Sequence, residues 1–171
     1  MIQGQGGLHF ETIMGSRNRN IQVNSIPGMT ILRFANQHAA RSSVTLESTP
    51  QLLRSMRTGV KINGKPWKIG TPCFFGDGQQ FGIVKDLVAW VDNFQFTLIL
   101  HLQQYRVHGN GTQSWVSTAP DKPPTTIFWN ELTHRCKVYE KQVNGITVQA
   151  VVRVSTTQPH MDGIDFDHHM H

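Results

Sequence analysis

The chain has 171 residues, of which 38% are hydrophobic and 16% charged, with a formal net charge of +5. This length suits one domain with flanking segments, and no apolar run approaches the roughly 18 residues of a membrane span. Two cysteines exclude a disulfide-rich secreted framework, so Cys73 and Cys136 are expected to be buried thiols. The first residues lack a basic segment followed by an apolar core, so we expect a nuclear or cytoplasmic protein that is not secreted.

The basic residues are concentrated in the first part of the chain. Residues 1–70 hold nine lysines and arginines against two glutamates, a net charge of +7. Residues 71–171 hold seven basic and nine acidic residues, a net charge of −2. A basic segment favours an anionic partner, and nucleic acid is the commonest one. A solvated basic face would have the same composition, so both interpretations remain open.

The first sixty residues combine alternating apolar and polar positions with turn residues. The alternation predicts strands at residues 8–14, 21–23, 29–34 and 43–47. A turn is expected at Pro27-Gly28, because these residues interrupt regular structure. Residues 51–57 place apolar side chains at helical spacing after Pro50, which predicts one or two helical turns that link two halves of the chain.

Three hairpins are predicted between residues 60 and 154, where turn residues separate β-branched and aromatic segments. Asn63-Gly64 and Asn144-Gly145 are dipeptides that two-residue hairpin turns favour, since both turn residues need a positive φ. The paired strands are expected at residues 60–62 with 65–69, 73–75 with 81–85, and 137–139 with 146–154.

The longest strand is predicted at residues 94–107, after a strand at 87–91. Its large apolar side chains recur at every second position and therefore share one face: Phe94, Phe96, Leu98, Leu100 and Leu102. Thr97 and Ile99 are expected on the opposite face. A helical turn is predicted at residues 130–133.

Short strands at roughly ten-residue spacing, separated by glycine-rich turns, predict an all-β fold with little helix. We expect a small barrel of the SH3-like or bromo-adjacent-homology-like (BAH-like) kind in residues 59–155. Residues 1–58 are expected to form a basic N-terminal β extension and a linker, and residues 156–171 a flexible tail rich in histidine and aspartate.

No assembled catalytic motif is present in the sequence, so we expect a protein that is not an enzyme and has no cofactor. His134 and Cys136 are two positions apart and would share a face of a strand, which leaves a catalytic thiol as an alternative. The terminal tail holds imidazole and carboxylate groups that suit zinc, nickel or copper, but it has no visible scaffold, so no metal site is expected. These groups belong to His160, Asp162, Asp165, Asp167, His168, His169 and His171.

The candidate nucleic-acid contacts are basic side chains of a loop, of residues 51–57 and of the first hairpin. They are Arg17, Arg19, Arg54, Arg57, Lys61, Lys65 and Lys68. Such side chains can bind phosphates, and Phe10, Phe34 and Trp67 are interleaved with them. DNA is expected as the ligand rather than RNA. The alternative is a protein-binding or assembly module that uses an apolar β surface, and the oligomeric state remains open.

Residues 69–87, with the sequence IGTPCFFGDGQQFGIVKDL, carry a resemblance to known families. Together with the long strand that follows, they resemble the C-terminal β region of transposase-like proteins derived from mobile elements. The segment that begins at Phe81-Gly82 is also similar to the opening of BAH and related SH3-like chromatin modules. The resemblance covers roughly residues 60–155 and implies a non-catalytic accessory domain that binds nucleic acid or a chromatin protein. No functional residue is carried over from these families.

Overall fold

The computed structural model describes residues 2–3, 9–15, 17–42, 45–46, 49–93, 96–109 and 114–157. Within these ranges the chain is built almost entirely of strands, with one α-helix and one short 3-10 helix, so the expected all-β class with little helix is confirmed. The helices are α1 (Ile26–Ala39) and η2 (Trp129–Glu131). The strands are β1 (Ile2–Gln3), β2 (His9–Thr12), β3 (Asn18–Ile21), β4 (Leu52–Met56), β5 (Val60–Ile62), β6 (Lys65–Trp67), β7 (Pro72–Phe75), β8 (Gln80–Val91), β9 (Phe96–His108), β10 (Ser114–Thr118), β11 (Thr125–Phe128), β12 (Leu132–Val143) and β13 (Ile146–Thr156).

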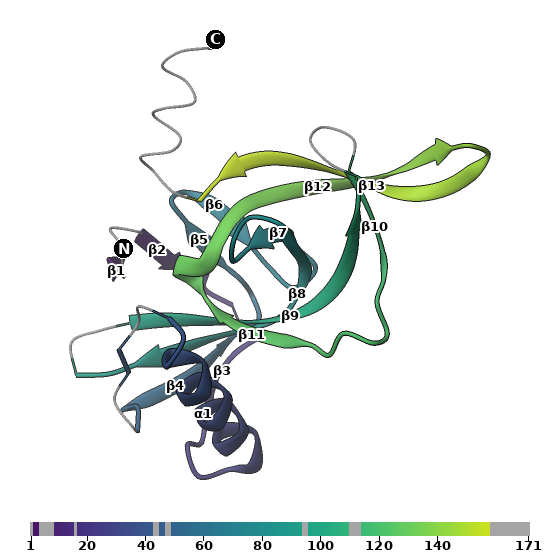
Figure 1. Ribbon diagram of the computed structural model, residues 1–171. Coiled ribbons are helices and arrows are strands. Elements are labelled where there is room, and N and C mark those ends of the chain that lie inside the picture. The colour runs from purple at the N-terminus through teal and green to yellow at the C-terminus, as the bar shows by residue number, and fades with distance from the viewer. Residues whose placement is uncertain are drawn as a thin grey trace.

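Six strands form a closed antiparallel circuit, in which hydrogen bonds join β7 to β8, β8 to β9, β9 to β10, β10 to β13, β13 to β12 and β12 back to β7. The circuit is visible as a ring in Figure 1. A cluster of buried side chains from these strands fills it, including Phe74, Phe81, Val116, Cys136 and Val151. The barrel is thus a packed core rather than a pore, whereas its relation to SH3-like or BAH-like modules stays a prediction.

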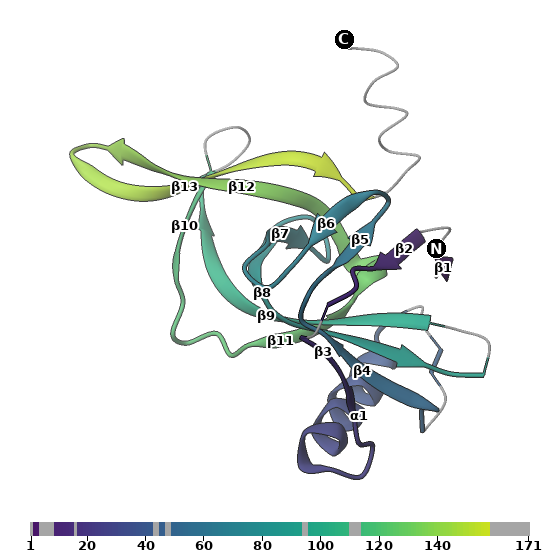
Figure 2. The ribbon, with the colours of Figure 1, turned by 180° about the vertical axis from the view of Figure 1, so that it is seen from behind.

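The longest strands belong to the barrel at one end and to a second sheet at the other. The first part of β8 pairs with β7, whereas residues 88–91 pair with β4. The register of β8 against β9 shifts between Val84 and Asp86, so a β-bulge lies where β8 passes from the barrel into the second sheet. The second sheet has the order β3-β4-β8-β9-β11, and α1 lies against one of its faces (Figures 1 and 2).

All three predicted hairpins are present. Asn63 and Gly64 have φ angles of 50° and 79°, and Asn144 and Gly145 have 52° and 79°, as the sequence predicted. The hairpin of β12 and β13 extends beyond the barrel ring as a projecting arm (Figures 1 and 2). The helical turn expected at residues 130–133 is the 3-10 helix η2.

Several predictions for the first sixty residues are wrong. The turn predicted at Pro27-Gly28 and the strand predicted at residues 29–34 both lie within α1, and the helical turns predicted at 51–57 are the strand β4. Of the strand predicted at 21–23, only Ile21 belongs to a strand, β3. The predicted strand at 43–47 lies mostly outside the described residues. Burial alternates over the first four residues of β4, where Leu53 and Ser55 are buried and Leu52 and Arg54 half-buried, and the strand is paired on both edges.

The helix α1 begins where the sequence predicted a turn. The Ser25 hydroxyl accepts a hydrogen bond from the Gly28 backbone N–H at 3.1 Å and so caps the helix. Pro27 is tolerated in the first turn, because its missing N–H would have no partner within the helix. Ile31, Leu32 and Ala35 then follow at helical spacing and pack against the main core.

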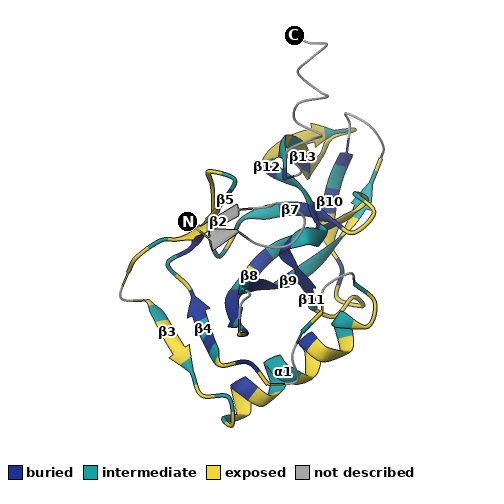
Figure 3. Ribbon diagram, turned by 90° about the vertical axis from the view of Figure 1, so that its left-hand side faces the viewer, coloured by how far each residue is buried: buried dark blue, intermediate teal, exposed yellow. Residues whose placement is uncertain are grey.

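The predicted core face of the long strand is confirmed for Leu98, Leu100 and Leu102, which are buried; Phe94 lies outside the described residues. The opposite face is buried as well, since Thr97 is 0% exposed and Ile99 3% exposed. This second burial follows from α1, which covers that face of the sheet with its inner side, as the colours in Figure 3 show.

The N-terminal extension shares both sheets with the rest of the fold. Strand β4 pairs with β8, and β2 pairs with β5 in the smaller sheet β1-β2-β5-β6. Strands on the two sides of the boundary expected at residue 58 are therefore hydrogen-bonded to each other. The terminal tail from residue 158 onward lies outside the described residues.

The helix cap allows a first test of this fold. Replacing Ser25 by alanine removes the acceptor for the Gly28 N–H, and we expect the free energy of unfolding to fall by about 1 kcal/mol. Urea denaturation monitored by tryptophan fluorescence measures the change. Ser25→Thr keeps the hydroxyl and is expected to retain most of the stability; equal loss in both variants would contradict the capping role.

Candidate functional site

A groove along α1, made of three adjoining pockets, contains several of the predicted contacts. The first, called here the arginine recess, has a volume of about 630 Å³. It shares Pro27 and Asp86 with a second, apolar pocket of about 320 Å³. The apolar pocket in turn shares Phe34, His101 and Thr126 with a third, the histidine pocket, of about 220 Å³. Because neighbouring pockets share lining residues, we treat the three as one α1 groove.

Three arginines from separate segments meet at the arginine recess. Arg17 precedes β3, Arg19 lies within it opposite Ser55, and Arg57 follows β4. The pairing of β3 with β4 therefore brings residues some forty positions apart in the chain to one site. All three side chains are exposed, and within the described part of the chain none of them forms an ion pair. They are consequently available to an anionic ligand.

One carboxylate lies among these arginines, at the position of the β8 bulge. Asp86 lines both the arginine recess and the apolar pocket, and its Oδ1 accepts the Leu87 backbone N–H at 2.9 Å. The recess as described therefore combines three cationic side chains with one anionic side chain, so its local charge is positive.

The apolar pocket lies between the first turns of α1 and the sheet. Ile31 and Phe34 from the helix face Val88 and Ile99 from the strands, and Thr30, His101 and Thr126 add polar atoms. Phe34 is 42% exposed, an unusual degree for a phenylalanine that also lines a pocket. The ring is thus accessible to a ligand at the mouth of the groove.

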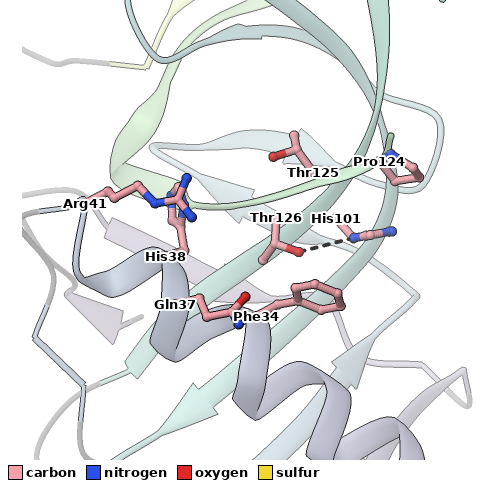
Figure 4. Close-up of a pocket in the computed structure, with 8 residues that line it drawn as sticks. All are labelled: Phe34, Gln37, His38, Arg41, His101, Pro124, Thr125 and Thr126. Carbon is pink, nitrogen blue, oxygen red and sulfur yellow. Dashed lines mark hydrogen bonds between the residues drawn. The ribbon is translucent and has the colours of Figure 1, made fainter. Parts of the chain in front are cut away.

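The histidine pocket forms the other end of the groove (Figure 4). His38 Nε2 lies 2.5 Å from Glu131 Oε2, and the same oxygen accepts the Phe128 backbone N–H at 2.8 Å. This contact ties the last turn of α1 to η2 and β11. Figure 4 shows Phe34 and His101 on the same side of this pocket, with His101 hydrogen-bonded to Thr126 at 3.3 Å. Arg41 places an exposed guanidinium at this end.

The seven predicted contacts divide into separate groups. Arg17, Arg19 and Arg57 line the arginine recess, whereas Arg54 is directed to the other face of β4 and donates to Asn20 Oδ1 at 3.2 Å. The three lysines belong to another sheet, on or directly after the β5–β6 hairpin. Lys61, Lys65 and Lys68 are all exposed there, with Lys61 opposite Glu11 of β2.

Several groove residues were missed because α1 was not predicted. Arg41, His38 and Gln37 belong to its last turns or follow it, and they come to the groove only because the helix lies across the sheet. Ser25 followed by Pro27 is a helix-start signal that could have revealed them. Of the interleaved aromatic residues, Phe34 lines the groove, Trp67 is buried and unavailable, and the side chain of Phe10 lies outside the described residues.

The two cysteines are free and buried. Desolvation by burial raises the pKa of Cys136 to about 12, although a backbone hydrogen bond and the nearby Arg153 charge each lower this pKa. Burial also raises the pKa of Cys73. The Cys136 thiol lies 3.8 Å from the backbone oxygen of His134, while the His134 imidazole lies beside Thr133. The printed contact of the Cys136 thiol is thus with a backbone oxygen, and its raised pKa disfavours the thiolate.

These pKa directions predict how the thiols respond to pH. The folded protein favours the protonated Cys136 thiol, so its pKa is raised above the ordinary value of 9.0. The resulting contribution to stability is fully present below pH 9 and is lost as the pH rises toward 12. We expect a disulfide reagent such as dithionitrobenzoate to leave both thiols of the native protein unmodified at neutral pH and to titrate both in denaturant. Rapid reaction of one thiol in the native protein would instead revive Cys136 as a nucleophile.

No group of three or more histidine, cysteine, aspartate or glutamate side chains suited to a metal ion occurs among the described residues. The histidine-rich tail lies outside them. None of the helices that the structure describes is long and apolar enough to cross a membrane. Comparison of the chain with protein-family models, with curated proteins and with solved structures found no match.

Proposed function

We propose that this protein is a non-catalytic nucleic-acid-binding module whose arginine recess holds backbone phosphates. The observation that carries the proposal is the convergence of Arg17, Arg19 and Arg57 on one recess while their guanidinium groups form no ion pair within the described part of the chain. Arginine suits this task because its planar guanidinium can donate two parallel hydrogen bonds to a phosphate.

Further support comes from the distribution of charge around the recess. The same half of the chain carries a second exposed basic group, Lys61, Lys65 and Lys68, on or directly after the β5–β6 hairpin of the smaller sheet. Phosphate contacts of this kind position a protein on nucleic acid without reading its sequence. The module is therefore proposed to bind with low sequence specificity, and DNA is the proposed ligand in preference to RNA.

The test is binding of the purified protein to fluorescent DNA and RNA by fluorescence anisotropy across a series of salt concentrations. Neutralising phosphates releases counterions, so three contacts predict a slope of about −2 to −3 in a plot of log affinity against log salt. Tight, salt-dependent binding supports the proposal, and a DNA affinity above the RNA affinity supports the preferred ligand. Absence of binding at low salt would refute the function.

A second candidate is an assembly module, and exposed apolar side chains of the β12–β13 hairpin favour it. On its two strands, Tyr139, Ile146, Val152 and Val154 are 43–66% exposed, which is unusual for large apolar side chains in strands. Exposed apolar strands are common sites of association between chains. Analytical ultracentrifugation tests this candidate: self-association that persists at high salt and is lost in Ile146→Glu favours it, and a monomer at all concentrations opposes it.

A further inference from the structure

We propose that the α1 groove binds single-stranded nucleic acid, with phosphates at its two ends and one unstacked base in the apolar pocket against Phe34. The inference rests on the proposed function and deepens it, because it names the form of nucleic acid that the site accepts. It depends on three features of the groove: its continuity, the placement of its charges and the exposure of one aromatic ring.

The groove is continuous over a length that suits a short oligonucleotide. Its pockets share residues along the whole of α1, from Pro27 near the first turn to Phe34 and then Arg41 beyond the last. Fourteen residues of helix at a rise of 1.5 Å span about 21 Å. Sites for single strands on small β-barrel domains start at about four nucleotides, which a groove of this length accommodates.

The charges of the groove lie where phosphates of one bound strand would lie. Arg17, Arg19 and Arg57 occupy one end, and Arg41 occupies the other. Asp86 lies between the arginine recess and the apolar pocket, where a carboxylate repels phosphate but can accept a hydrogen bond from the amino group of a base. Along the groove, a cationic end, an apolar middle and a second cationic end follow one another. This order matches a nucleic-acid single strand that directs one base into the groove.

The apolar pocket has the composition of a base-binding site. Its volume of about 320 Å³ is walled by Ile31, Val88 and Ile99, while Thr30 and Thr126 offer hydroxyl groups that can donate or accept hydrogen bonds. Phe34 is exposed at the rim, and the Arg33 guanidinium lies 5.1 Å from its ring centre. Aromatic rings and guanidinium planes are the groups on which unpaired bases stack.

A paired base could not enter this pocket. In a duplex the bases are stacked and paired within the helix, and a protein that takes up one of them must first extrude it at a cost of a few kcal/mol. A single strand exposes its bases without this cost. An apolar peptide would also fill the pocket, but it would leave the four arginines at the two ends without anionic partners.

The test compares Phe34→Ala with Met29→Ala in the full chain. Met29 is 59% exposed on the same helix and does not line the groove, so it is the matched control. The probes are a short oligothymidylate labelled with fluorescein and a labelled duplex of the same length. Loss of one stacking contact predicts a drop of about fivefold or more in single-strand affinity for Phe34→Ala and no change for Met29→Ala. Phe34→Tyr keeps the ring and is expected to restore binding.

Photo-crosslinking gives an independent measurement that does not depend on the folding of a variant. An oligonucleotide with bromodeoxyuridine is expected to crosslink to α1 or β9 at the apolar pocket, as located by mass spectrometry of the wild-type protein. Equal affinity for duplex and single strand, unchanged binding by Phe34→Ala, or crosslinks confined to the β5–β6 hairpin would overturn the inference while leaving the arginine site standing. Absence of binding by any probe would overturn the proposed function itself.

Discussion

Replacing Arg17, Arg19 and Arg57 together by glutamate is expected to reduce nucleic-acid affinity by roughly a thousandfold or more at low salt. Each guanidinium that binds a phosphate makes a charge-assisted hydrogen bond, which contributes at least about 1.5 kcal/mol to the binding free energy. Losing three such contributions lowers the affinity by more than about a thousandfold. Charge reversal adds repulsion to this loss. Fluorescence anisotropy with the same labelled DNA measures the affinity, and the slope of log affinity against log salt should become shallower by about two to three.

The matched control is the triple charge reversal of Lys61, Lys65 and Lys68, which lie on or directly after the β5–β6 hairpin. It changes the net charge of the protein by the same amount, so a purely general charge effect would weaken binding equally in both variants. We expect the arginine variant to lose far more affinity, because its three side chains line one recess whereas the lysines lie on a separate sheet. A greater loss in the lysine variant would move the interface to the hairpin.

The arginines are exposed, so this comparison is not confounded by loss of the fold. Substitutions at exposed side chains away from buried networks usually change the free energy of unfolding by no more than about 0.5 kcal/mol. Urea denaturation of both triple variants checks this expectation. Loss of binding accompanied by unchanged stability would assign the effect to the interface.

The fold could be predicted from the sequence where local signals agreed with the tertiary structure. The Asn63-Gly64 and Asn144-Gly145 turns dictate their own backbone conformation, so both hairpins were predicted correctly. The period-two pattern around Leu98 and Leu100 also predicted the core face of β9. The sequence predicted a barrel but not which strands close it, because closure depends on pairing between β7 and β12, which lie some sixty residues apart in the chain.

The prediction failed where the same residues suited two structures. Residues 29–34 are apolar and β-branched enough to suggest a strand, yet Ser25 and Pro27 start a helix before them. Leu52, Leu53 and Met56 lie at helical spacing, but pairing with β3 and β8 holds them in a strand. In β4, tertiary contacts override a weak local preference, whereas in α1 a local start signal decides the structure.

The candidate site was predicted only in part for a related reason. Net charge identified Arg17, Arg19 and Arg57 without showing that β3 and β4 bring them together. Phe34 and Arg41 needed the helix to be recognised before their place in the groove could be inferred. Composition thus indicates the chemistry of a ligand, while the long-range pairing of strands decides which of the charged residues can act on it together.

The position of α1 over the sheet depends on a single glycine. Gly28 is buried in the first turn of the helix, and a Cβ atom at this position would lie 2.1 Å from the Gln22 backbone oxygen and 2.9 Å from that of Val23. These are backbone atoms that cannot rotate away. Because Gly28 has no side chain, the first turn of α1 can lie against residues 22–23, which follow β3. Gln22 also lines the arginine recess.

Gly28→Ala is expected to destabilise the protein, although alanine is a better helix former than glycine by about 1 kcal/mol. The steric conflict forces α1 away from residues 22–23 and should lower the free energy of unfolding by about 3 kcal/mol, the upper part of the range for overpacked sites. Urea denaturation measures this loss. Because Gln22 also lines the arginine recess, nucleic-acid affinity at temperatures where the variant is folded should fall as well.

The control is Gly145→Ala in the turn of the β12–β13 arm, which separates steric conflict from backbone strain. Gly145 has a φ of 79° and open space around its missing Cβ, so alanine there meets the strain of the left-handed conformation, about 1 kcal/mol, but no clash. The control variant should keep full nucleic-acid affinity, since the arm is remote from α1 in Figure 1. If Gly28→Ala instead raised the stability as helix propensity alone predicts, then the first turn of α1 would not be pressed against residues 22–23, and the groove described here would need a different geometry.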